Sequence, residues 1–246
     1  MTIRPAACST HARSMPTTWH DAESHPENFM TSLTTGYTLV VWLAGCAFFF
    51  VIQAHQAIRF LRTHDGPPLT WFLLTPVALI YLLTVGWLLT LPPAVPDSTV
   101  LRCIVLLIMG VPLTLTDLRC QWLPMRYTLA FWLTGLASAA LPEAVLTLDE
   151  ALTASLSAYV LSGTVRWLAN RGQTEERMGL GDVYLMAGLC AWLPWRSASY
   201  AAAGGLLLFC LCAALTRQTS KPFAPALFGY LCGVCILFPQ QLVGVL

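Results

Sequence analysis

The sequence predicts an all-α fold, a polytopic membrane helix bundle of about eight transmembrane helices. Of the 246 residues, 57% are hydrophobic and only 10% are charged, whereas soluble globular domains carry about 25% charged residues. The mean hydropathy is +0.66, and several apolar runs approach the roughly 20 residues with which a helix crosses a bilayer. A net charge of +1 gives no sign of a nucleic-acid partner, so the lipid bilayer is the partner that composition indicates.

The first 36 residues differ from the rest of the chain. Residues 1–36 are polar, rich in Ser, Thr, Pro and His, and show no hydrophobic periodicity. This composition predicts a disordered N-terminal tail, and without an apolar stretch before a cleavage site it does not resemble a secretory signal peptide. Translation could also start at Met15 or Met30. Residues 37–246 then form the predicted transmembrane domain.

Eight apolar segments follow the tail, each with the composition of a buried or membrane-spanning helix. In order, they are 37–58, 69–91, 99–116, 127–146, 152–169, 182–195, 199–215 and 226–246. The loops between them are short, which favours a compact bundle in which consecutive helices run antiparallel.

Basic residues in the short loops predict the orientation, because such residues are retained on the cytoplasmic side. With the tail outside, nine Lys and Arg residues face the cytoplasm and two, Arg102 and Arg196, face the other side, leaving aside the tail. The nine are Arg59, Arg62, Arg119, Arg126, Arg166, Arg171, Arg177, Arg217 and Lys221. Both termini are therefore expected to lie outside.

Two carboxylates have matching depths in this topology. Asp117 follows Arg102 by 15 residues, and Asp182 precedes Arg196 by 14, which corresponds to roughly 21–23 Å along a helix. Because the hydrocarbon core is about 30 Å thick, both carboxylates are expected several ångströms below the cytoplasmic surface. A carboxylate at membrane depth is energetically costly and marks a candidate functional site.

A pair of carboxylates can hydrolyse a peptide bond by activating water. One of them, ionised, takes a proton from the attacking water, and the other, protonated, donates to the carbonyl oxygen and then to the leaving amine. Neighbouring carboxylates do not both ionise easily, so such a pair titrates as a coupled unit. This chemistry predicts no cofactor and no metal, and it leaves the acid and base roles of Asp117 and Asp182 open.

Each carboxylate also has a purely structural interpretation. Gly179 and Gly181 allow close backbone approach, and a positive φ where needed, so that an extended substrate segment could lie beside Asp182. In the structural interpretation Asp182 caps the helix that follows it, and the two glycines form the turn. Asp117 could be an interfacial residue paired with Arg119. A proton-coupled transporter and a non-catalytic assembly scaffold are further alternatives, because intramembrane carboxylates also mark proton pathways.

Other hydrolytic chemistries lack their motifs in this chain. There is no H-E-x-x-H zinc motif and no G-x-S-x-G nucleophile turn, and all five histidines precede Asp117. The one C-x-x-C pair, Cys232 and Cys235, lies in an apolar segment. Cysteines in such segments pack as small hydrophobes, and a structural zinc site normally takes about four ligands. We therefore expect this pair to serve packing.

Three segments, in this order, resemble the type IV prepilin peptidases, a family of membrane aspartic proteases of the GxGD type. Residues 117–124, an Asp followed by a polar turn and Leu-Pro, are similar to the family's first aspartate motif. Residues 176–185, which contain M-G-L-G-D, resemble the second motif. The third segment, Pro222, Phe223 and Pro225, resembles a P-F-x-P turn that enters the last helix.

The resemblance implies an aspartic endopeptidase that removes the short basic leader from type IV prepilins or pilin-like subunits of type II secretion. Cleavage is expected at the cytoplasmic face of the bacterial inner membrane, after a glycine that precedes the substrate's hydrophobic helix. By the same resemblance Asp117 and Asp182 are the catalytic pair. The motif residues that support the active site are Gly179, Gly181, Pro222, Phe223 and Pro225.

One segment departs from the family pattern. Many members also methylate the new N-terminus and carry a cysteine-rich cytoplasmic loop between the first two helices, whereas residues 59–68 form a short loop without cysteine. The departure predicts a short, peptidase-only form without zinc in that loop. Residues 225–227 also spell the P-A-L of the presenilin relatives, but Thr116 precedes Asp117 where those proteins have Tyr. The pattern of eight spans favours the prepilin peptidases.

Overall fold

The computed structural model describes residues 26–91, 97–141, 144–172, 176, 178–216 and 222–238, with side chains from residue 36 onward. Within these residues the chain forms eight α-helices and no strand, which confirms the predicted all-α fold. The helices are α1 (Pro26–Thr63), α2 (Trp71–Leu89), α3 (Asp97–Cys120), α4 (Met125–Ala139), α5 (Leu148–Asn170), α6 (Leu180–Trp192), α7 (Trp195–Thr216) and α8 (Ala224–Leu237).

The first helix begins earlier than the sequence predicts. α1 starts at Pro26, whereas the apolar segment was expected to start at residue 37. Residues 1–25, most of the predicted disordered tail, lie outside the described residues. Residues 1–40 form one unit and residues 41–246 a second, which contains the rest of α1 and all the other helices.

All eight predicted segments contain a helix, although residues 239–246 of the last one lie outside the described residues. Four of the helices are long and apolar enough to cross a membrane. These four are residues Gly36–Thr63 of α1, together with α2, α3 and α7. The helices α6 and α8 are apolar but shorter, with 13 and 14 residues. The helix α4 ends at Ala139, before the predicted end of its span at residue 146. The chain is thus a polytopic helical membrane protein in which several helices are short.

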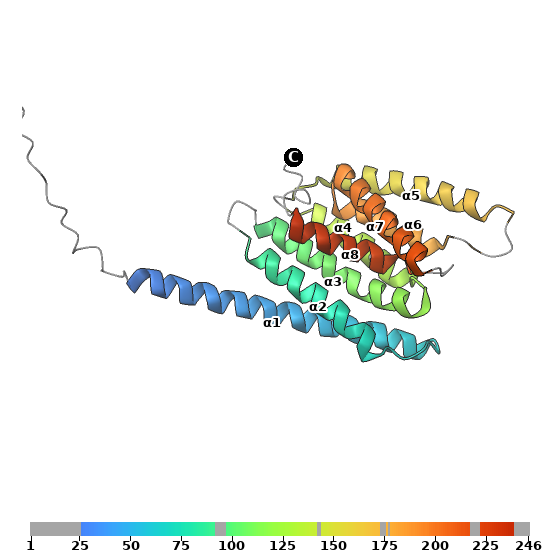
Figure 1. Ribbon diagram of the computed structural model, residues 1–246. Helices are drawn as coiled ribbons and strands as arrows, with labels where there is room; N and C mark the ends of the chain where they lie inside the picture. Colours follow the sequence, from blue (N-terminus) through green and yellow to red (C-terminus); the bar gives the residue numbers. More distant parts are fainter. Residues whose placement is uncertain are drawn as a thin grey trace, which may run out of the picture. The chain divides into compact units, whose positions relative to one another are not determined.

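The helices of the second unit form an antiparallel bundle (Figure 1). The helix α6 packs mainly against α4 and α5, and α8 packs against α7, α3 and α2. The helix α3 is the most buried of the four long apolar helices. Because consecutive helices alternate in direction, the end of α3 and the beginnings of α6 and α8 meet at one end of the bundle (Figure 1).

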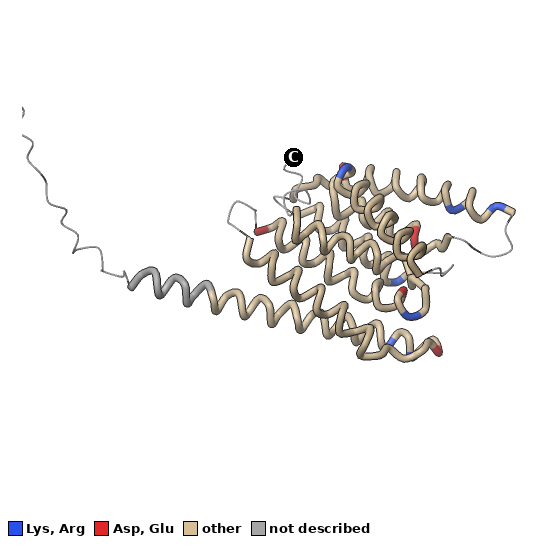
Figure 2. Tube along the Cα trace, viewed as in Figure 1, with Lys and Arg blue, Asp and Glu red and all other residues tan. Residues whose placement is uncertain are grey.

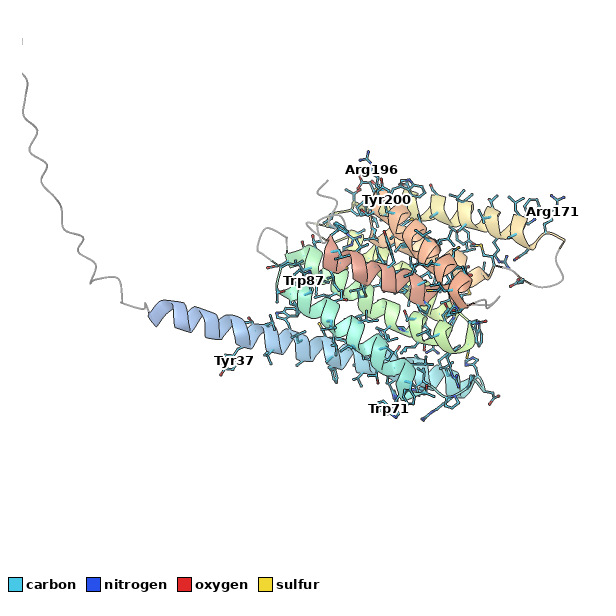
Figure 3. The ribbon with its side chains drawn as sticks, in the orientation of Figure 1. Tyr37, Trp71, Trp87, Arg171, Arg196 and Tyr200 are labelled. Atoms are coloured by element: carbon cyan, nitrogen blue, oxygen red, sulfur yellow. The ribbon has the colours of Figure 1, made fainter. Side chains whose placement is uncertain are left out.

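Charged and aromatic residues mark the two ends of this bundle. Figure 2 shows that Lys and Arg lie at or near helix ends. In Figure 3, Trp71 and Trp87 stand at the two ends of α2, and Arg171 and Arg196 lie at opposite ends of the bundle. Trp71 and Trp87 are 79% and 47% exposed, as expected for tryptophans at the two membrane interfaces. Arg171 follows α5, at the end where α6 begins.

Glycines let α8 approach its neighbours closely. A Cβ on Gly205 of α7 would stand 2.9 Å from the Cα of Leu227, and a Cβ on Gly110 of α3 would stand 2.3 Å from a ring carbon of Phe228. Helix association in a membrane depends largely on van der Waals packing, and small residues at a crossing permit this approach. The crossings of α8 with α3 and α7 therefore require glycine at these positions.

We predict that Gly205→Ala destabilises the protein by about 1–3 kcal/mol, because the new methyl group meets the backbone of Leu227. The matched control is Gly163→Ala in α5, where no described atom lies within 4 Å of the added carbon. Alanine at that position is expected to be neutral or to stabilise the helix by up to about 1 kcal/mol. Thermal unfolding in detergent measures both, and equal stability of the two variants would contradict the packing argument.

Candidate active site

The first carboxylate is buried and bonded to a distant helix. Asp117 lies in the last turn of α3 and is 4% exposed. Its Oδ2 atom accepts a hydrogen bond from the backbone N–H of Ala224 at 2.7 Å, across a sequence separation of 107 residues. The backbone N–H of Phe223 also hydrogen-bonds to this carboxylate. Asp117 thereby caps the N-terminus of α8.

The start of α8 explains why this cap is needed. The first N–H groups of a helix have no acceptor within the helix. Ala224 begins α8, and Pro225, the next residue, has no N–H to satisfy. The N–H of Leu227 bonds to the carbonyl of Phe223 at 3.1 Å. The P-F-x-P turn therefore presents its N–H groups to Asp117, which accounts for the third motif structurally.

The second carboxylate caps its own helix. Asp182 is half-buried in the first turn of α6, and its Oδ2 accepts the backbone N–H of Gly179 at 3.2 Å. A carboxylate at this position satisfies an N–H and interacts favourably with the helix dipole. Asp182 therefore caps α6 as the sequence suggested, but from the third position of the helix, because Gly179 is the N-cap residue.

The two glycines of the G-L-G-D segment have different roles. A Cβ on Gly181 would stand 2.5 Å from the Cβ of Leu123 and 2.8 Å from its carbonyl oxygen. Gly181 is therefore required for the close approach of α6 to the segment between α3 and α4. Gly179 has a φ of −73°, and its added Cβ would meet nothing nearer than 3.5 Å. Neither glycine has a positive φ, and the close approach of a substrate segment that these glycines would allow stays a prediction.

These contacts bring Asp117 and Asp182 together. Leu123 lies a short turn after Asp117, and Gly181 immediately precedes Asp182, so their contact joins the two motifs. The two carboxylates are close enough to interact electrostatically. The alternative pairing of Asp117 with Arg119 is wrong, because the described residues form no ion pair between them. The Nε of Arg119 instead donates to the carbonyl of Pro68 at 3.0 Å.

The segment before Asp182 is held by α5 through contacts that the sequence does not reveal. The Nδ2 of Asn170 donates to the carbonyl of Met178 at 3.0 Å, and the N–H of Met178 donates to Oδ1 of Asn170 at 3.1 Å. Arg166 and Glu176 form an ion pair with an N to O distance of 2.7 Å. Asn170 thus binds both backbone groups of Met178, and only its location at the end of α5 could have drawn attention to it.

No metal site is formed by the described part of the chain, where no three His, Cys, Asp or Glu side chains cluster suitably. The expectation of a mechanism without metal or cofactor stays a prediction. Cys232 and Cys235 are free and buried in the apolar core, which agrees with the packing role expected for them.

One region of the chain, which contains both carboxylates, is similar to a known protein family. Residues 103–216 match the type IV leader peptidase family. The matched region contains Asp117, Asp182 and both glycines, whereas the P-F-x-P turn lies beyond it. The match confirms the resemblance that the sequence motifs indicated.

Three curated relatives carry corresponding names. A type 4 prepilin-like proteins leader peptide-processing enzyme of Escherichia coli O78:H11 is 33% identical over 51% of this chain and 47% of its own. A prepilin leader peptidase/N-methyltransferase of Pectobacterium carotovorum is 28% identical over 52% of this chain and 48% of its own. Another of that name, from Klebsiella pneumoniae, is 31% identical over 42% and 44%. The chain spans about half the length of these relatives, and no solved structure matches it.

We predict that Gly181→Ala lowers the free energy of unfolding much more than Gly179→Ala does. The added methyl group at position 181 meets the carbonyl oxygen of Leu123, which a rotamer change cannot move, and is expected to cost about 1–3 kcal/mol. At position 179 the backbone conformation and the space both accept alanine, so the cost is expected to stay below about 1 kcal/mol. Thermal unfolding in detergent distinguishes them, and a larger loss for Gly179→Ala would refute the assignment of roles.

We also predict that Asn170→Ala loosens the segment that leads to Asp182. Loss of the paired hydrogen bonds to Met178 is expected to cost about 1–3 kcal/mol and to speed hydrogen exchange at residues 178–182. The control is Thr164→Val, because the exposed hydroxyl of Thr164 bonds to the carbonyl of Val160 within α5 and to no other group in the described part of the chain. Hydrogen exchange followed by mass spectrometry measures the effect, and unchanged protection in Asn170→Ala would show that the clamp is dispensable.

Proposed function

We propose that this chain, whose residues 103–216 belong to the type IV leader peptidase family, is a membrane-embedded aspartic endopeptidase. Its substrates are type IV prepilins or pilin-like secretion subunits, from which it removes the basic leader peptide. The observation that carries the proposal is the convergence of Asp117 and Asp182 at one end of the bundle, each held by backbone N–H groups at the start of a helix. The names of the three relatives support the substrate class.

The proposed reaction is attack of water on the peptide carbonyl between the two carboxylates. The ionised member of the pair takes a proton from water as it attacks, and the protonated member donates to the carbonyl oxygen. When the tetrahedral intermediate collapses and the C–N bond breaks, the carboxyl group that took a proton from water gives it to the leaving amine. The other carboxylate takes back the proton from the hydroxyl group, which restores the starting state of the pair. The backbone N–H groups of Ala224 and Gly179 hold the two side chains in place. The carboxylates therefore do not have to be reoriented during the reaction, which would cost free energy.

The orientation that we propose places this site at the cytoplasmic face of the bacterial inner membrane. In the topology that the sequence predicts, nine of the eleven basic residues that follow the tail lie on the side of Asp117 and Asp182, and basic residues are retained in the cytoplasm. Arg171, at the end of α5, lies at the opposite end of the bundle from Arg196 (Figure 3). A leader peptide that remains in the cytoplasm would reach the site from this side.

We predict that Asp117→Asn and Asp182→Asn each lower the cleavage of a prepilin by at least about 100-fold, because an amide cannot cycle the proton. The matched control is Asp97→Asn, an exposed carboxylate in the first turn of the same helix as Asp117. The assay follows removal of the leader from a prepilin co-reconstituted in liposomes. Normal trimming by either active-site variant would exclude the proposed pair and would favour a transporter or scaffold.

A further inference from the structure

A groove between three helices begins beside Asp117 and runs into the bundle. Side chains of α2, α3 and α8, which pack against one another (Figure 1), enclose a cavity of about 250 Å³. On α3 the lining positions are 107, 110, 111, 114 and 118, which recur on one helix face. They extend over roughly 16 Å of helix. The lining is almost entirely apolar, and Phe228 of α8, which lies against Gly110, joins the two helices there.

The groove lies next to the candidate active site along both α3 and α8. Leu118, which lines the groove, directly follows Asp117 in α3, and Thr114, which also lines it, lies about one turn before Asp117. Pro225 of its lining directly follows Ala224, whose N–H is bonded to Asp117. A chain lying in this groove would therefore extend from the carboxylate toward the middle of the membrane.

One polar group in the groove has no partner. Tyr81 of α2 lines the groove and is 3% exposed, and its hydroxyl has no hydrogen-bond partner among the described residues. Its ring is fixed by stacking on Phe50, with ring centroids 5.4 Å apart. A buried hydroxyl without a partner destabilises the folded state, so a hydrogen-bonding group from a bound molecule is expected at this depth. A lipid acyl chain would leave the hydroxyl unsatisfied.

We propose that this groove binds the apolar helix of the substrate that follows the scissile bond, with a polar group of that helix bonded to the hydroxyl of Tyr81. This assignment rests on the proposed function. An apolar cavity of about 150 Å³ accommodates a benzene ring, so the groove accepts about two large apolar side chains from one face of a helix. The groove then determines which bond lies at Asp117, and it makes an apolar segment part of what the enzyme recognises.

A leucine at Gly229 tests the groove by filling it. Gly229 belongs to the lining, and no described atom lies within 4 Å of an added Cβ, so Gly229→Leu should fold normally. Its control is Gly163→Leu in α5, which has equal space outside the groove. For a prepilin with its apolar helix, Gly229→Leu is expected to raise KM by about tenfold or more. For a peptide that ends a few residues after the scissile bond, it is expected to leave KM unchanged. Equal KM values of the two variants for the full prepilin would overturn the proposal.

The Tyr81 contact has its own test. Tyr81→Phe is expected to raise KM for the full prepilin by about threefold to tenfold, while thermal stability stays equal or rises because an unpaired hydroxyl is removed. An unchanged KM together with higher stability would show that the hydroxyl meets no substrate group, and would overturn the contact.

Binding measured without cleavage separates the groove from the reaction. A photoreactive benzoylphenylalanine at position 229, in the Asp117→Asn background, is expected to cross-link the prepilin, whereas the same residue at position 163 is not. Cross-linking at position 229 with no cleavage by the wild-type protein would support substrate binding in the groove and contradict the proposed reaction. Cleavage by the wild-type protein without cross-linking at position 229 would support the proposed reaction and contradict substrate binding in the groove.

Discussion

The hydrogen bond from Ala224 to the carboxylate of Asp117 is the contact on which the candidate site depends. A carboxylate buried near the end of a membrane helix is costly without partners, and so is a helix N-terminus whose N–H groups are unsatisfied. The 2.7 Å bond resolves both problems with one contact and joins α3 to α8. Pro225 contributes by removing one N–H that would otherwise need an acceptor.

Close approach of the backbones is the second constraint, and it follows from the first. Asp117 can reach α8, and Asp182 can reach Asp117, only if α3, α6 and α8 approach more closely than ordinary side chains allow. Gly110 provides this between α3 and α8, and Gly181 provides it between α6 and the segment after α3. Small residues at membrane helix crossings permit tight packing, and here the same packing determines where the carboxylates lie.

Local sequence patterns predict the helices and the motif residues, but they do not predict the partners of those residues. The eight apolar segments and both aspartates could be found because apolar periodicity and intramembrane charge are local signals. The bond between Asp117 and Ala224 spans 107 residues and has no local signal. For the same reason the sequence suggests Arg119 as a partner of Asp117, whereas in the structure Arg119 donates a hydrogen bond to the carbonyl of Pro68. The two glycines look alike in the sequence, and only the position of Leu123 distinguishes them.

The position of the pair at two helix N-termini bears on how water could be activated inside a membrane. The N-terminus of a helix carries a partial positive charge, so α8 and α6 each favour a negative charge on the carboxylate that caps it. The two carboxylates interact electrostatically, and repulsion opposes the simultaneous ionisation of both. In the mechanism that we propose, these two influences together favour a pair with one negative charge and one shared proton. That state contains both the base that water needs and the acid that the carbonyl oxygen needs. In the mechanism that we propose, the protonation state of the pair therefore depends on the backbone geometry at the start of α6 and α8, where N–H groups bond to the two carboxylates.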